Sequence, residues 1–73
     1  MYTYYFSLSL NYEECRVLYL PENHSVVVTE EKGKRIQIHS KNLRPFVSQN
    51  GLRGRFRLVI NNDKKLVSLD KMS

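Results

Sequence analysis

The alternation of apolar and basic residues in segment 51–60 constrains the fold more than any other feature. The segment reads Gly-Leu-Arg-Gly-Arg-Phe-Arg-Leu-Val-Ile. Because successive side chains of a β-strand point to opposite faces, Phe56, Leu58 and Ile60 would share one face. The other face would carry the three arginines Arg53, Arg55 and Arg57. The pattern predicts a strand with one side on a core and an arginine row at the surface.

Residues 1–10 alternate in the same way. Large apolar side chains occupy the even positions from Tyr2 to Leu10, and small polar ones occupy most odd positions. This period of two predicts a half-buried first strand. Tyr5 is an aromatic on the otherwise polar face. It is expected to cover a neighbouring strand, to sit in an interface or to stack on a ligand.

Segment 11–20 carries the signals of a short helix. Asn11 suits the N-cap, and Glu14 stands three residues later, where a capping-box partner belongs. Pro21 ends the helix, because the residue before a proline is pushed out of the α region. The predicted buried stripe consists of Tyr12, Cys15, Leu18 and Tyr19.

The remaining chain predicts two hairpins joined by a helical turn. Three valines favour the first strand of the hairpin at 25–39, and Gly33 supplies positive φ at its turn. Ser40 begins a helical turn over 40–44, after which Arg44-Pro45 should return to an extended chain and Phe46 should anchor on the core. The second hairpin spans 52–70, with a last strand at 66–69 and a frayed tail from Asp70 to Ser73.

These elements predict one α+β domain over residues 1–73. Its order is β-α-β-β-β-β. We expect a strongly curled antiparallel sheet of about five strands with the short helix on its apolar face. A small open barrel plugged by the helix is the close variant.

Charge is distributed unevenly along the chain. The net charge is +5, but residues 1–31 hold five glutamates and one arginine, whereas residues 32–73 hold eleven Lys or Arg and two Asp. A basic half favours an acidic partner: nucleic acid, an acidic protein surface, or the acidic half of a second copy. A solvated basic face that only keeps the protein soluble is the plainer alternative.

The sequence also indicates the compartment. Cys15 is the only cysteine, which excludes an internal disulfide framework. The N-terminus lacks a basic leader and a cleavage signal, and no apolar run reaches membrane-spanning length. We expect a cytoplasmic protein with no membrane partner.

Four segments together resemble a family of short bacterial proteins that is catalogued only as a domain of unknown function. They are Tyr-Tyr-Phe-Ser-Leu at 4–8, Tyr-Glu-Glu-Cys at 12–15, Asn-Leu-Arg-Pro-Phe at 42–46 and Gly-Arg-Phe-Arg-Leu at 54–58. The resemblance covers nearly the whole chain. It implies a stand-alone bacterial protein and supplies no catalytic or ligand residues.

The arginine row is the strongest candidate for binding. Side chains two apart on a strand are about 6.6–6.8 Å apart, and two nucleotides of one strand advance by roughly 6.8 Å. The guanidiniums are therefore spaced to follow phosphates, with Lys34, Arg35 and Arg44 widening the basic face. However, the aromatic Phe56 alternates away from the arginines, although single-strand binding usually needs exposed aromatics. A third interpretation pairs the arginines with Glu30, Glu31 or Asp70 of adjoining strands.

Catalytic and metal chemistry have little support. Cys15 with His24 or His39 would resemble a nucleophile and base, but Cys15 lies on the predicted buried stripe, where free cysteines are usually inert. The same three residues lack metal-ligand spacing. The sequence therefore predicts no enzyme, no metal or other cofactor and no small-molecule ligand.

Two functional hypotheses remain from different classes. The first is an interaction module whose basic sheet face contacts an acidic protein or a second copy. The alternative is sequence-nonspecific RNA or DNA binding through Arg53, Arg55 and Arg57. Phosphate binding requires unpaired arginines continuous with the other basic residues, whereas an interaction surface would show exposed apolar residues such as Tyr5 or Val59 beside the charges.

Overall fold

The protein has five strands and three short helical segments in the residues that its computed structural model describes, 1–22 and 25–72. The strands are β1 Tyr2–Leu10, β2 Ser25–Thr29, β3 Arg35–His39, β4 Leu52–Ile60 and β5 Leu66–Lys71. The helical segments are η1 Glu14–Tyr19, α1 Ser40–Leu43 and η2 Arg44–Phe46. His24, considered above as a base, and Ser73, the end of the predicted tail, lie outside the described residues, as does Asn23.

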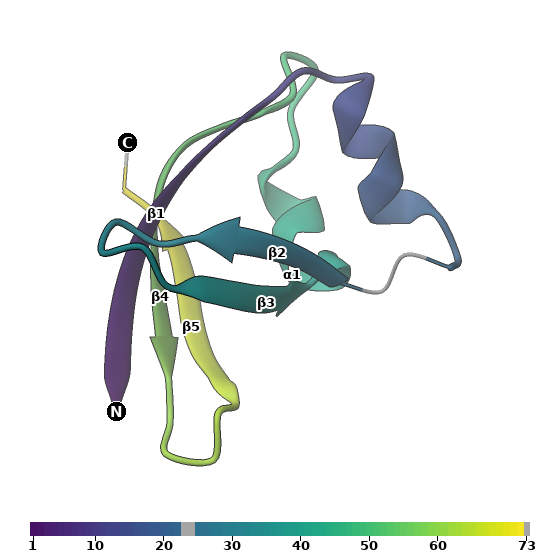
Figure 1. Cartoon of the computed structure of the whole chain (residues 1–73). Coiled ribbons are helices and arrows are strands. Elements are labelled where there is room, and N and C mark those ends of the chain that lie inside the picture. Colours follow the sequence, from purple (N-terminus) through teal and green to yellow (C-terminus); the bar gives the residue numbers. More distant parts are fainter. Residues whose placement is uncertain (23–24, 73) are drawn as a thin grey trace.

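The strands form two antiparallel sheets instead of the predicted single sheet of five (Figure 1). One has the order β1-β4-β5, and the other is the β2–β3 hairpin. The described strands form no closed barrel. The hairpin stays separate because it buries its apolar face against the larger sheet, and a single backbone bond from Glu31 N–H to the Tyr5 carbonyl (2.8 Å) ties its turn to β1. The architecture is thus α+β with antiparallel strands.

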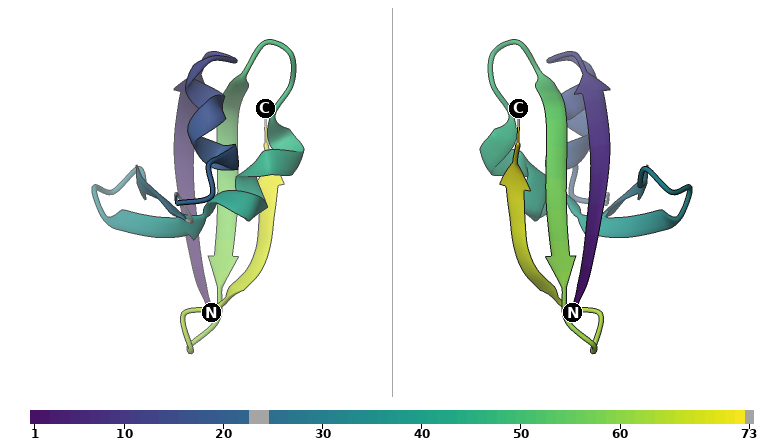
Figure 2. Two further views of the ribbon diagram at one scale, coloured as in Figure 1. Left: turned by 90° about the vertical axis from the view of Figure 1, so that its right-hand side faces the viewer. Right: turned by 90° about the vertical axis from the view of Figure 1, so that its left-hand side faces the viewer.

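The three-stranded sheet has one buried and one open face, as the alternation predicts. Its inner face carries Phe6 and Phe56, which are paired in register and stack with ring centroids 5.4 Å apart. The segment η1 and the consecutive segments α1 and η2 cover the upper part of this face, while the other face is open (Figure 2). Phe46 packs edge-on against Phe56 at 5.4 Å and so anchors the loop as predicted. The buried core comprises Phe6, Cys15, Leu18, Val28, Ile38, Leu43, Leu52, Phe56 and Leu58.

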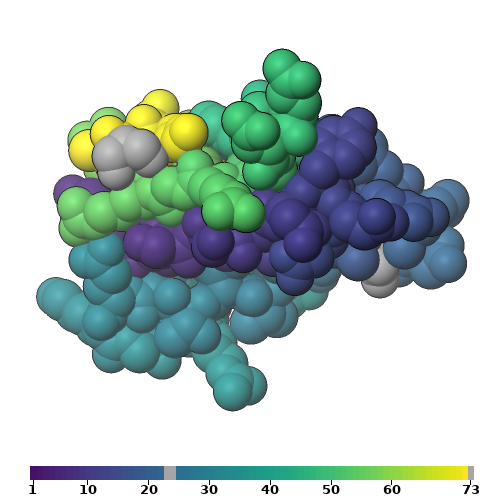
Figure 3. Space-filling model, turned by 90° about the horizontal axis from the view of Figure 1, so that it is seen from above, coloured from purple at the N-terminus to yellow at the C-terminus, as the bar shows by residue number. Residues whose placement is uncertain are grey.

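The β2–β3 hairpin lies at the β1 edge of the large sheet, and its strands run crosswise to β1 (Figures 1 and 2). Its pairs Val26–Ile38 and Val28–Ile36 place apolar side chains on one side, and Val28 and Ile38 are fully within the core. Seen from above, the teal hairpin lies beside β1, on the side away from β4 and β5 (Figure 3). Below the hairpin the inner face of the sheet remains open.

The first helical segment is a 3-10 helix, not the α-helix predicted over 11–20. The capping box is present: Asn11 N–H donates to Glu14 Oε1 (2.9 Å), and Glu14 N–H donates to Asn11 Oδ1 (2.8 Å). With three residues per turn, Cys15 and Leu18 face the core, whereas the other two predicted stripe residues, Tyr12 and Tyr19, are exposed. The buried stripe is therefore only two residues long.

Two further segments differ from expectation. Arg44–Phe46 is a helical turn, not an extended chain, because Pro45 near its start has the φ that a first helical turn requires. The predicted frayed tail is wrong for Asp70 and Lys71, which belong to β5. Pairing continues to Met72, whose N–H donates to the Arg55 carbonyl at 2.6 Å. None of the described helices has the length and apolarity needed to cross a membrane.

Candidate functional site

The arginine row lies on the open face of the three-stranded sheet, which we call the outer face. β4 is the central strand of that sheet, so its arginines are not at an edge. Arg53 is exposed and forms no ion pair within the part of the chain that the structure describes. Arg55 and Arg57 each form an ion pair with an acidic residue of the same chain.

Arg55 is held by Glu31 and Tyr5. Its Nε and Nη2 donate to the two carboxylate oxygens of Glu31 at 2.7 and 3.0 Å, and its guanidinium lies 4.7 Å from the centre of the Tyr5 ring. These hydrogen bonds lower the pKa of the Glu31 carboxyl and raise the pKa of Arg55. Tyr5, the predicted aromatic contact, thus packs against an arginine of its own chain. The ion pair between Arg55 and Glu31 joins the hairpin turn to the large sheet.

Arg57 is paired with the last strand. Its Nη2 donates to Asp70 Oδ2 at 3.3 Å across the β4–β5 ladder, while its buried Nε has no hydrogen-bond partner among the described residues. Two of the three arginines therefore meet acids of their own chain. The third interpretation paired the arginines with Glu30, Glu31 or Asp70 of adjoining strands; Arg57–Asp70 is such a cross-strand pair, whereas Glu31 lies in the turn between β2 and β3.

The other predicted basic residues are not continuous with the row. Arg44 donates from Nε to the Leu18 carbonyl (2.6 Å) and lies over the Tyr19 ring, within the helical layer. Lys34 Nζ donates to the hydroxyl of Tyr4 at 3.1 Å, and this bond raises the pKa of Lys34. Since Tyr4 alternates with Tyr5 along β1, Lys34 belongs to the inner side of the sheet. Arg35 is exposed on β3.

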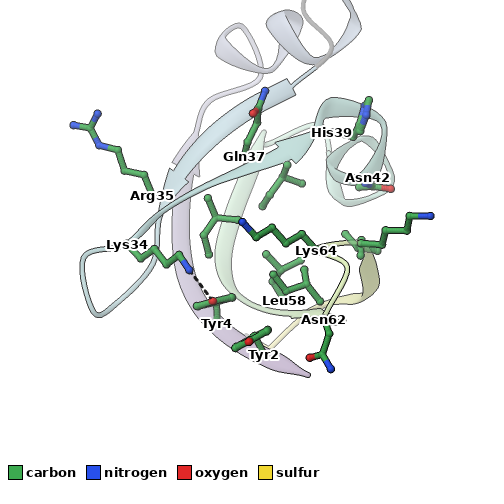
Figure 4. Close-up of a pocket in the computed structure, with 15 residues that line it drawn as sticks. Tyr2, Tyr4, Lys34, Arg35, Gln37, His39, Asn42, Leu58, Asn62 and Lys64 are labelled. Atoms are coloured by element: carbon green, nitrogen blue, oxygen red, sulfur yellow. Dashed lines mark hydrogen bonds between the residues drawn. The ribbon is translucent and has the colours of Figure 1, made fainter.

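A groove of about 750 Å³ lies between β3 and the uncovered part of the inner face (Figure 4). Its basic residues come from two turns and one strand: Lys34, Arg35, His39, Lys64 and Lys65. Its apolar residues come from both sheets: Ile36, Ile38, Leu58, Ile60 and Leu66. Tyr2, Tyr4, Gln37, Asn42 and Asn62 complete the lining, and we call the whole the basic groove. No Asp or Glu is found among these lining residues of the described chain.

The two sides of the basic groove are positioned by turns. Gly33 with φ +97° closes the hairpin next to Lys34. On the opposite side, Asn61 Oδ1 accepts bonds from the N–H groups of Asp63 (2.9 Å) and Lys65 (3.0 Å). In that turn Lys64, not an asparagine or aspartate, takes positive φ (63°). Its side chain reaches across the groove, whereas Arg35 points outward (Figure 4).

The sequence singled out Lys34 and Arg35 of this groove and missed its other side. Tyr2 and Tyr4 were assigned to the buried side of the first strand, but Tyr2 is 53% exposed. Lys64 and Lys65 were not among the predicted binding residues. The sequence feature that could have predicted the groove is the presence of lysines in both hairpin turns, since folding brings these lysines to one groove.

Comparison with curated proteins and with solved structures gives no match. A family model described as "Protein of unknown function (DUF2835)" matches residues 2–72. The chain therefore belongs to this DUF2835 family of proteins of unknown function.

Proposed function

We propose that this protein is a small cytoplasmic interaction module that binds an acidic protein partner in the basic groove. The observation that carries the proposal is the composition of the groove. Four Lys or Arg side chains border an apolar floor, and no carboxylate among the lining residues of the described chain balances them. Such a surface attracts negative charge and gains further stability by burying apolar groups.

The outer face is the weaker candidate for the same role. Glu31 and Asp70 already neutralise Arg55 and Arg57, so a partner there would first have to displace internal ion pairs. In the basic groove the ammonium of Lys34 donates to the hydroxyl of Tyr4 and forms no ion pair with an acid of the described chain. Its charge is therefore available to a ligand.

The floor of the groove favours a protein over a nucleic acid. Ile36, Ile60 and Leu66 offer aliphatic surface, which suits apolar side chains and gives bases nothing to stack on. Of the two tyrosines, Tyr4 is covered by the Lys34 ammonium, 5.1 Å from its ring centre. Among the described lining residues Tyr2 and His39 remain as rings for stacking, whereas the rest of the floor is aliphatic and single-strand binding usually uses several aromatic platforms.

The experiment is a binding titration with a charge-reversed groove. A fluorescein-labelled peptide of alternating glutamate and valine is titrated with the wild type and with the double variant Lys64→Glu/Lys65→Glu. The matched control, Lys32→Glu/Arg53→Glu, carries the same change in net charge outside the groove. We expect the groove variant to bind at least tenfold more weakly and the control to stay within about threefold, because reversing charge near the ligand costs far more than reversing it at a distance.

Three other results have defined meanings. Equal weakening in both variants would overturn the groove assignment and leave only a general charge effect. Tighter groove-dependent binding of a single-stranded oligonucleotide than of the peptide would overturn the protein assignment. Self-association in sedimentation velocity that the groove variant alone abolishes would identify the acidic partner as a second copy, and thereby support the proposal.

A further inference from the structure

One edge of β3 opens onto the basic groove. All six residues from Lys34 to His39 line the groove, those that face the core as well as those that face solvent. A strand whose residues of both faces border one cavity presents its edge to that cavity. In the described chain β3 has β2 as its neighbour on one side and no strand on the other.

The register identifies the main-chain groups at this edge. Glu30 N–H donates to the Lys34 carbonyl at 2.8 Å, so the pair 30–34 is a hydrogen-bonded pair of the hairpin. Hydrogen-bonded and non-bonded pairs alternate along an antiparallel ladder. Ile36 and Ile38 therefore bond to β2, and the N–H and C=O groups of Arg35 and Gln37 point into the groove. No backbone bond within the described residues engages these groups.

We propose that the partner enters the basic groove as an extended segment that pairs with the free edge of β3 and adds a third strand to the hairpin. This inference rests on the function proposed above and specifies how the acidic partner is held. Main-chain bonds to Arg35 and Gln37 supply affinity independent of the partner's sequence, as in other cases of strand addition.

The faces of β3 determine which side chains the segment carries. Residues opposite Ile36 and Ile38 point towards the inner face of the large sheet, where Ile60 and Leu66 lie. Residues opposite Arg35 and Gln37 point outward, on the face of β3 from which the Arg35 side chain projects (Figure 4). The fitting ligand is therefore a segment of about five residues, the length of β3, in which apolar and acidic residues alternate.

Hydrogen exchange tests the pairing directly. In the free protein we expect the amides of Ile36 and Ile38 to be protected by β2 and those of Arg35 and Gln37 to exchange rapidly. We expect the alternating glutamate–valine peptide, at saturating concentration, to slow exchange at Arg35 and Gln37 by at least tenfold and to change Ile36 and Ile38 much less. Unchanged exchange at Arg35 and Gln37 in the saturated complex would overturn strand addition and leave groove binding intact.

N-methylated peptides provide the second measurement. One peptide carries backbone methyl groups on its glutamates and the other on its valines, so that each blocks the amides of one edge. A loss of at least tenfold affinity in one methylated peptide, with affinity retained in the other, supports strand addition. The N–H groups of the glutamates bond to β3 if the added strand is antiparallel, and those of the valines bond if it is parallel. Equal binding of both methylated peptides and the parent would overturn it. Failure of the parent to bind would instead overturn the proposed function itself.

Discussion

Gly51, in the loop before β4, and Gly33, in the turn of the β2–β3 hairpin, form a matched pair for testing how closely the end of β1 approaches that loop. Both have strongly positive φ, +100° and +97°. A Cβ on Gly33 would have nothing within 4 Å, whereas one on Gly51 would lie 2.1 Å from the Leu10 carbonyl oxygen. That distance falls 0.9 Å short of the 3.0 Å minimum that real Cβ contacts reach, and the obstacle is backbone. Gly51 is thus the place where the end of β1 touches the loop before β4.

The two alanine variants should therefore differ greatly. In Gly33→Ala, a positive φ costs about 1–2 kcal/mol, and the loss of unfolded-state freedom returns about 0.4–1 kcal/mol. The net destabilisation is about 1 kcal/mol. Gly51→Ala adds the displacement of a paired strand end, which belongs with the rare substitutions above about 4 kcal/mol. The whole domain of 73 residues is expected to have only about 4–11 kcal/mol of stability.

Urea unfolding followed by circular dichroism measures both effects. With a slope of about 1 kcal/mol per molar urea for so small a domain, Gly33→Ala should shift the midpoint by about 1 M. Gly51→Ala should show no folded baseline, or a midpoint lower by more than about 4 M. Equal shifts in the two variants would refute the close approach of Leu10 to Gly51.

Three other substitutions or probes test separate parts of the structure. Phe56→Ala should cost about 3–5 kcal/mol in the same assay, because it removes the ring at the centre of two aromatic contacts; a loss below about 1 kcal/mol would contradict that packing. Cys15 is 2% exposed, and burial raises the pKa of its thiol. An aromatic disulfide reagent should therefore react with it roughly 100-fold faster after denaturation. Equal reaction rates would show that Cys15 is accessible in the folded protein. Arg55 lowers the pKa of Glu31 below its usual 4.5, so Glu31 stabilises the fold above that pH and loses its effect as pH falls through the folded-state pKa. Glu31→Gln should therefore lower stability at pH 7 and match the wild type near pH 2, by urea titration at each pH; a constant difference would contradict the ion pair.

Local patterns in the sequence were sufficient for most of the individual elements. Alternation placed β1 and β4, and the Asn11–Glu14 capping box marked where a helix begins. These features depend on neighbours within a few residues. The same reasoning gave the wrong type of helix at 14–19 and an extended chain at Pro45, because the choice between helical, 3-10 and extended geometry in so short a segment depends on packing.

The arrangement of the sheets depended on contacts between distant residues. Nothing local to Val28 or Ile38 says whether the hairpin extends the large sheet or packs across it. The candidate site follows from that choice, since packing of the hairpin at the β1 edge brings Lys34 and Lys64 to one groove and turns the free edge of β3 towards its apolar floor. Composition predicted a basic surface with an acidic partner, and the fold moved the better candidate from the arginine row to the groove.

The most direct test of the groove as the binding site is a titration of ¹⁵N-labelled protein with the alternating glutamate–valine peptide, followed by amide chemical shifts. The account predicts saturable shifts that are largest at Arg35, Gln37, Lys64 and Lys65, with Arg53 on the outer face little changed. Shifts concentrated at Arg53 and its neighbours on the outer face, or no saturable shift at low salt, would contradict it.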